Sequence, residues 1–140
     1  MRKYVFIFFI SMYVLSGCTR TQEFAHTKAT IAKQSMIAEL EEEVEKLDDF
    51  YDTAMIETDD QVLIAYKIKH LKRFQMKKIE KDFNTRLEEV FPEKKIEISN
   101  DYKIFLETNR LIDEMKNDQL SNKEVEKKLK KIIQLKKEMT

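Results

Sequence analysis

Glycine is almost absent from this sequence: among 140 residues the only one is Gly17, and the only proline is Pro92. After residue 17, no residue can adopt a positive φ without steric cost, so tight hairpin turns of type I′ or II′ are not expected. Lys, Glu, Leu, Ile and Met are abundant instead, and these residue types favour helix. The sequence therefore predicts an all-α fold.

The first predicted helical segment runs from about residue 27 to residue 56. Its apolar residues are spaced by three and four positions, as in the seam of a coiled coil. They are Ile37, Leu40, Val44, Leu47, Tyr51 and Ala54. This spacing predicts either a coiled-coil-like hairpin or part of a helical bundle.

A second helix is predicted to begin after Thr58, because Thr58 and Gln61 have the spacing of an N-terminal capping box. It is expected to end near Phe91, since Pro92 disfavours helical backbone in the residue before it. Residues 27–91 would then form one long helical hairpin, with Leu71 and Phe74 facing inward. The aromatic residues expected in the core are Tyr51, Phe74, Phe83, Phe91 and Phe105.

Charge is distributed unevenly along this predicted hairpin. Eight acidic and one basic side chain lie between Glu39 and Asp52, whereas seven basic and one acidic lie between Lys67 and Lys81. Individual exposed ion pairs are weak, but opposed blocks of charge specify register. We expect the blocks to pair within the chain. The alternative is that they face outward and bind oppositely charged partners.

Residues 92–98 are predicted to be a linker and residues 99–140 a second helical hairpin. Ser121 and Glu124 form a capping box at the start of its last helix. The expected architecture is elongated, with helical hairpins in a four-helix arrangement.

The N-terminus has the composition of an export signal. Arg2 and Lys3 precede an apolar run from Tyr4 to Leu15, which is shorter than the ~20 residues that a membrane-spanning helix needs. The run ends in Leu15, Ser16, Gly17 and Cys18, and Cys18 is the only cysteine. These residues resemble the signal peptide and lipobox of bacterial lipoproteins.

The resemblance implies that residues 1–17 are removed and that acyl chains, including palmitate, attach to Cys18. Residues 18–26 would be a short tether for a helical domain at 27–140. Acyl chains on one cysteine would hold the protein on a membrane of the cell envelope. Because Thr19 rather than Asp follows Cys18, the resemblance favours the outer membrane if the cell has two membranes.

No catalytic constellation can be assembled from this sequence. The two histidines are His26 and His70, and only Glu23-x-x-His26 has the spacing of a metal-binding motif in helical bundles. A second such motif is lacking, so we predict no metal, no cofactor, no catalytic residue and no small-molecule substrate. The balance of 26 basic and 26 acidic side chains also argues against a nucleic-acid partner.

The sequence therefore predicts a non-enzymatic lipoprotein that acts through protein–protein contacts or self-association. In size, anchor and helicity it resembles accessory components of secretion and conjugation machines, such as pilotins and entry-exclusion proteins. The alternative is a surface lipoprotein that binds a ligand or host factor in a cavity between its helices.

Overall fold

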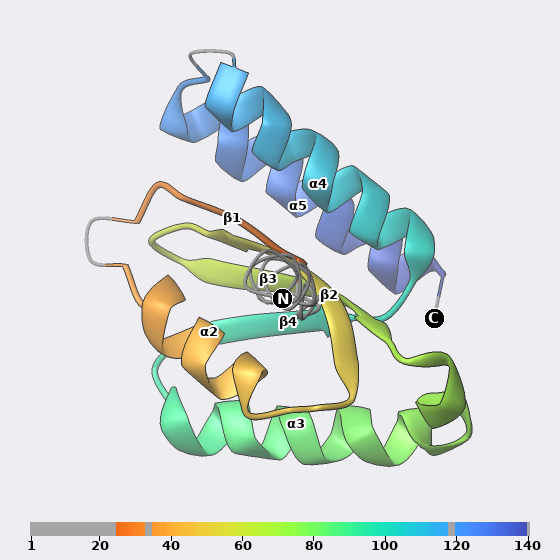
Figure 1. The fold of residues 1–140 in the computed structure, drawn as a ribbon. Helices are drawn as coiled ribbons and strands as arrows, with labels where there is room; N and C mark the ends of the chain where they lie inside the picture. Colours follow the sequence, from red (N-terminus) through yellow and green to blue (C-terminus); the bar gives the residue numbers. More distant parts are fainter. Residues whose placement is uncertain (1–24, 33–34, 118–119, 140) are drawn as a thin grey trace, which may run out of the picture.

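A four-stranded sheet with helices on both faces forms the fold, so the prediction of an all-α protein is wrong (Figure 1). The computed structural model describes residues 25–32, 35–117 and 120–139. In chain order the elements are β1 (Ala25–Thr30), α2 (Ile37–Glu45), β2 (Phe50–Glu57), β3 (Gln61–Ile68), the short 3₁₀ helix η1 (His70–Gln75), α3 (Met76–Val90), β4 (Lys95–Ser99), α4 (Tyr102–Asn117) and α5 (Asn122–Glu138).

The strands follow their order in the chain across the sheet, β1-β2-β3-β4. The central strands β2 and β3 form an antiparallel hairpin. Each outer strand is parallel to its neighbour, β1 to β2 and β4 to β3. Parallel neighbours need a crossover connection, and α2 and α3 provide the two crossovers.

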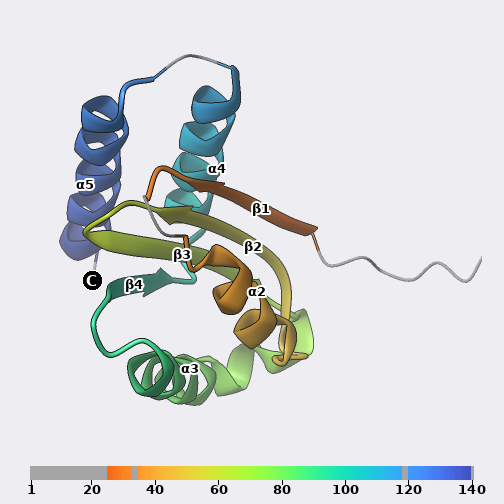
Figure 2. The ribbon, with the colours of Figure 1, turned by 90° about the vertical axis from the view of Figure 1, so that its left-hand side faces the viewer.

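The helices form two layers, one on each face of the sheet. Figures 1 and 2 show α2 and α3 on one face and the α4–α5 hairpin on the other. Alternate residues of the central strands point to opposite faces. Met55 and Ile64 therefore pack under α2 and α3, whereas Ile56 and Leu63 pack under α4 and α5.

Burial on both faces explains why residues 50–68 form strands rather than the predicted helices. Ala54, Met55, Ile56 and the run from Val62 to Tyr66 are all fully buried. A strand covered on both faces has a nearly continuous apolar sequence instead of an alternating one. Such a run has no strict period of two, and the many helix formers in the chain as a whole favoured the wrong interpretation, although half of these buried residues are β-branched or aromatic.

The predicted capping box at Thr58 is in fact the turn of the β2–β3 hairpin. The Thr58 backbone N–H donates to the Gln61 carbonyl at 2.9 Å. The Thr58 hydroxyl also donates to this carbonyl at 3.1 Å, and its oxygen accepts a hydrogen bond from the Gln61 N–H at 3.3 Å. Among the described residues none has a positive φ. The hairpin therefore turns without glycine, because side-chain bonds from Thr58 stabilise a loop that needs no left-handed residue.

Formation of this sheet also means that the predicted coiled coil and the predicted linker are wrong. Ile37, Leu40 and Val44 are buried on α2, but the seam ends there because Tyr51 and Ala54 belong to β2. The predicted linker at 92–98 contains most of β4. Leu71 and Phe74, which we expected to face inward, are exposed in η1.

The C-terminal helices agree more closely with the sequence. The capping box of Ser121 and Glu124 is confirmed at the start of α5. At the start of α4, the Asp101 carboxylate accepts hydrogen bonds from the N–H groups of Lys103 (2.8 Å) and Ile104 (3.1 Å). Both helices bury an apolar face against the sheet, as amphipathic helices do.

Opposite charges do pair between the acidic and basic segments, although in strands and loops rather than between two long helices. Lys67 pairs with Asp52 at 3.1 Å and Lys72 with Asp49 at 3.0 Å. Glu43 of α2 binds Arg86 of α3 across the same layer. Hydrogen bonds from Arg86, and then from Lys46, hold the pKa of the Glu43 carboxyl below its ordinary value.

Glu57, at the end of β2, is a fully buried carboxylate that joins three loops. Its side chain accepts hydrogen bonds from the Met36 N–H (3.1 Å) and the Ser35 hydroxyl (2.9 Å), both before α2. The Thr30 hydroxyl donates at 3.3 Å, and the Lys94 ammonium lies at 3.4 Å. A buried charge needs such partners, because an unpaired one is costly.

We expect Glu57→Gln to lower the free energy of unfolding by about 2–4 kcal/mol. The amide keeps the shape of the side chain, but it removes the charge beside Lys94 and turns an acceptor into a donor. Urea unfolding followed by circular dichroism measures the change. Glu88→Gln, at an exposed position of α3, is the matched control and should have almost no effect. Equal stabilities of the two variants would contradict a supporting role for Glu57.

Candidate functional site

Most of the residues singled out in the sequence lie outside the described part of the chain. Leu15, Ser16, Gly17 and Cys18 do so, as does Glu23. His26 belongs to β1, and His70 is exposed at the start of η1. Over residues 25–32, 35–117 and 120–139, no group of three or more His, Cys, Asp or Glu could hold a metal ion. In the same ranges, no helix has the length and apolar character needed to cross a membrane.

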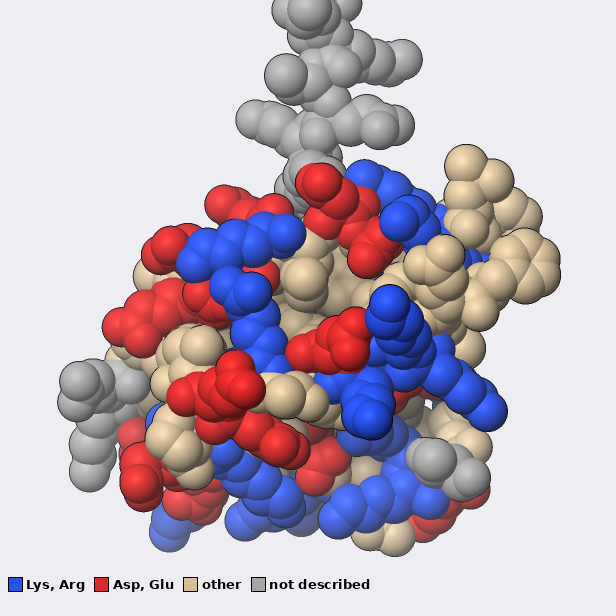
Figure 3. Space-filling view, turned by 90° about the horizontal axis from the view of Figure 1, so that it is seen from below, with Lys and Arg blue, Asp and Glu red and all other residues tan. Residues whose placement is uncertain are grey.

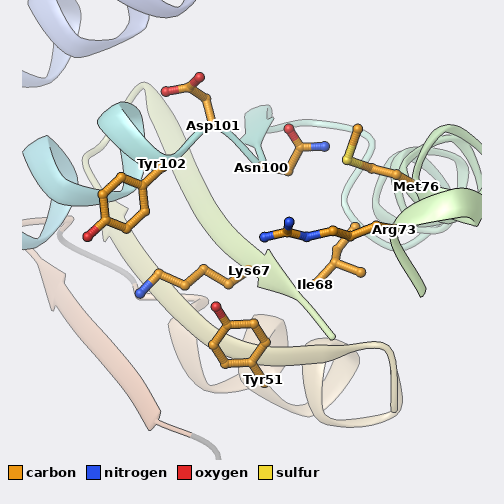
Figure 4. A pocket seen from close by; sticks show the side chains of 8 residues that line it. All are labelled: Tyr51, Lys67, Ile68, Arg73, Met76, Asn100, Asp101 and Tyr102. Carbon is orange, nitrogen blue, oxygen red and sulfur yellow. The ribbon is translucent and has the colours of Figure 1, made fainter. Parts of the chain in front are cut away.

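A pocket of about 400 Å³ opens at one end of the sheet, where β3 and β4 end and α4 begins. This place, which we call the sheet-end pocket, combines side chains from four parts of the chain (Figure 4). Its lining residues are Tyr51, Lys67, Ile68, Arg73, Met76, Asn100, Asp101 and Tyr102.

Tyr51 reaches this pocket because of a β-bulge. Phe50 pairs with Ile68 and Asp52 pairs with Lys67, so Tyr51 is an extra residue without a partner opposite. A bulge redirects the side chain of the strand in which it occurs. Tyr51 remains 46% exposed, whereas its neighbour Phe50 is buried in the core.

Lys67 is held by an ion pair and by aromatic rings. Its ammonium lies 3.1 Å from the Asp52 carboxylate and 3.9 Å from the centroid of the Phe105 ring. The rings of Tyr102 and Tyr51 are at 5.6 Å and 6.0 Å. An ammonium over a ring face is attracted by the ring quadrupole, so Lys67 ties β3 to β2 and to α4.

Arg73 is the cation of the pocket that is open to a ligand. Figure 4 shows its guanidinium extending from η1 into the middle of the pocket, between Asn100 and Ile68. It makes no ion pair with any residue that the structure describes. A guanidinium presents a planar fork of donors that fits a carboxylate or phosphate with two parallel hydrogen bonds.

The other polar groups of the pocket are engaged in supporting the fold. The Asp101 carboxylate caps α4, and the Asn100 amide donates to Glu80 at 3.4 Å. Tyr102 is 64% exposed at the rim. The pocket thus offers one available guanidinium and two accessible tyrosines in the same lining, an arrangement suited to binding an anionic group.

The sequence did not reveal this pocket. Tyr51 was expected to be a core residue, and Lys67 and Arg73 were expected on the charged face of a long helix. Their proximity depends on the pairing of β2 with β3 and on the bulge, neither of which has a local sequence signal here. Of the other aromatics expected in the core, Phe83, Phe91 and Phe105 are buried, whereas Phe74 is exposed.

We expect Lys67→Met to lower the free energy of unfolding by about 1–2 kcal/mol, since it removes the ring contact with Phe105 and leaves Asp52 unpaired. Thermal unfolding measures this loss. Asp52→Asn in the same chain should restore part of it, because no unpaired carboxylate then remains. If the two substitutions are simply additive, the Lys67–Asp52 pair does not contribute to stability.

The chain was compared with known proteins. No curated protein and no solved structure matches it. The family model described as "Sporulation lipoprotein YhcN/YlaJ" matches residues 17–135, which is most of the 140-residue sequence. This match confirms the prediction of a bacterial lipoprotein that is anchored to a membrane in the cell envelope. On the extent of the match, the chain belongs to the sporulation lipoprotein YhcN/YlaJ family.

Proposed function

We propose that this lipoprotein acts during sporulation as a non-enzymatic binding protein, held on its membrane by acyl chains on Cys18. We further propose that it contacts a protein partner through the sheet-end pocket. The family description supports the link to sporulation, and the composition of the pocket supports the mode of binding.

The observation that carries the protein contact is the accessible guanidinium of Arg73 in a pocket that Tyr51 and Tyr102 also line. Tyrosine and arginine are enriched among the residues that dominate the energy of protein interfaces. Both tyrosines can bury a ring while keeping the hydroxyl hydrated. An acidic side chain or a C-terminal carboxylate of the partner would pair with Arg73.

The arrangement of polar groups favours binding over catalysis. Lys67 is paired with Asp52, and Asp101 caps a helix. General acid–base chemistry needs a group that can exchange a proton with a substrate near neutral pH, and a guanidinium stays protonated. Arg73 therefore suits recognition of an anion.

A small anionic ligand is the second candidate, because a volume of about 400 Å³ lies within the range of small-molecule pockets. Arg73 would bind its acidic group in the same way as it would bind a carboxylate of a protein. The two candidates differ in what a photo-reactive residue at the rim of the pocket would capture.

We expect Cys18→Ala to release the protein from membranes and to abolish its labelling by palmitate. The thiol is the atom that would carry the acyl chains, and Cys18 is the only cysteine. Fractionation of sporulating cells and metabolic labelling test this, and separation of the membranes identifies which one holds the native protein. Ser16→Ala, which keeps a small residue before the cleavage site, is the control and should stay anchored. Unchanged labelling of Cys18→Ala would disprove the anchor.

We expect a photo-reactive amino acid at position 102 to crosslink a partner in sporulating cells. Arg73→Glu should reduce the yield by about tenfold, because loss of a charge pair and introduction of repulsion cost at least one factor of ten. Lys130→Glu, at an exposed position of α5, makes the same charge change elsewhere and should leave the yield unchanged. A second copy of this chain as the captured protein would indicate self-association. Equal yields from both variants would contradict a contact at Arg73, and capture of a small molecule alone would favour the second candidate.

A further inference from the structure

Two large apolar side chains project from η1 with almost no cover. Leu71 is 88% exposed and Phe74 is 99% exposed. In a 3₁₀ helix, residues three positions apart lie one above the other on the same side. Leu71 and Phe74 therefore form one apolar projection, which we call the η1 tip.

Basic side chains continue along the same side into α3. Helical spacing places Lys77, Lys78 and Lys81 three to seven positions after Phe74, next to the η1 tip. All three are exposed, and none forms an ion pair with a residue in the described ranges. Figure 3, which views the α3 side, shows uncharged side chains projecting at the right-hand end beside basic ones. Figure 1 places η1 at that end.

The acidic groups near the η1 tip are partly neutralised. Asp49 is paired with Lys72 and Asp52 with Lys67. Asp48 and Asp82 are the exposed acids that border these segments. The segment from η1 into α3 therefore keeps an excess of positive charge beside its apolar tip.

The η1 tip lies at the end of the sheet where β1, the first described strand, begins. Ala25, the first residue of β1, pairs with Asp52, and Asp52 pairs with Lys67, three positions before η1. Figure 2 shows the start of β1 and η1 on the same side of the molecule. Ala25 follows Cys18 by seven positions, so an anchor on Cys18 would lie within roughly 25 Å of it.

We propose that Leu71 and Phe74 insert into the interfacial region of the membrane that carries the anchor, while Lys77, Lys78 and Lys81 contact anionic headgroups. Aromatic and aliphatic side chains flanked by lysines are the pattern of membrane-surface binding. A short connection to an acylated cysteine keeps the η1 tip at high local concentration near the bilayer. This contact would orient the domain, with the sheet-end pocket close to the membrane surface, and it does not depend on a protein partner in that pocket.

The test uses the absence of tryptophan from the sequence. Phe74→Trp introduces a single fluorophore into the lipid-anchored protein, purified and reconstituted in vesicles of phosphatidylcholine and phosphatidylglycerol. We expect a blue-shifted emission that lipids brominated on their acyl chains quench. Val90→Trp, half-exposed at the other end of α3, is the matched control and should emit as in water. Emission of the Phe74→Trp protein that stays water-like and unquenched would overturn the proposal, as would a shift that appears only after a protein partner is added.

A second measurement separates insertion from anchoring. The mature chain carrying Cys18→Ala should still bind these vesicles weakly, and Leu71→Ser with Phe74→Ser should lower its partition coefficient by at least about tenfold. Val90→Ser should leave the partition coefficient unchanged. Raising the salt concentration should weaken binding, because headgroup contacts of lysines are screened. Equal partitioning of the η1 and Val90 variants would refute the inserted tip, whatever the crosslinking at position 102 shows.

Discussion

Burial of the β2–β3 hairpin on both faces is the constraint on which the rest of the structure depends. Met55 and Ile64 require a cover on one face, and Ile56 and Leu63 require one on the other. The two crossover helices α2 and α3 supply the first cover and the α4–α5 hairpin supplies the second. Each crossover also connects an outer strand with a parallel strand of the hairpin: α2 joins β1 to β2, and α3 joins β3 to β4. Glu57 then joins the loops at one end of the sheet through its buried hydrogen bonds.

The opposite end of the sheet carries the features that suit contact with other molecules. There the bulge at Tyr51 redirects a ring, Arg73 extends into the sheet-end pocket, and β1, the first described strand, begins at Ala25. Structural roles and binding roles are therefore separated along β2. The Glu57 end of this strand is buried, whereas at the other end Tyr51 is exposed and basic side chains of β3 and η1 lie beside it.

Local signals predicted the C-terminal part of the fold well, because caps and amphipathic faces are properties of short segments. The capping box of Ser121 and Glu124 and the apolar faces of α4 and α5 are examples. The same kind of signal failed at Thr58, where a capping-box spacing serves a hairpin turn. A threonine hydroxyl can bond to backbone groups at the start of a helix or across a turn, and the neighbouring tertiary contacts select between them.

The sequence by itself determined the class of the protein, since the residues from Leu15 to Cys18 form a contiguous motif whose meaning does not depend on folding. It also determined two of the helices and most of the core aromatics. Only the tertiary structure decided that residues 50–57 and 61–68 form strands, because a segment buried on both faces loses its periodicity. Only the tertiary structure brought Tyr51, Arg73 and Tyr102 together, because long-range strand pairing and a bulge place them there. Exposure of Leu71 and Phe74 was decided in the same way, since the described part of the chain leaves both side chains almost uncovered.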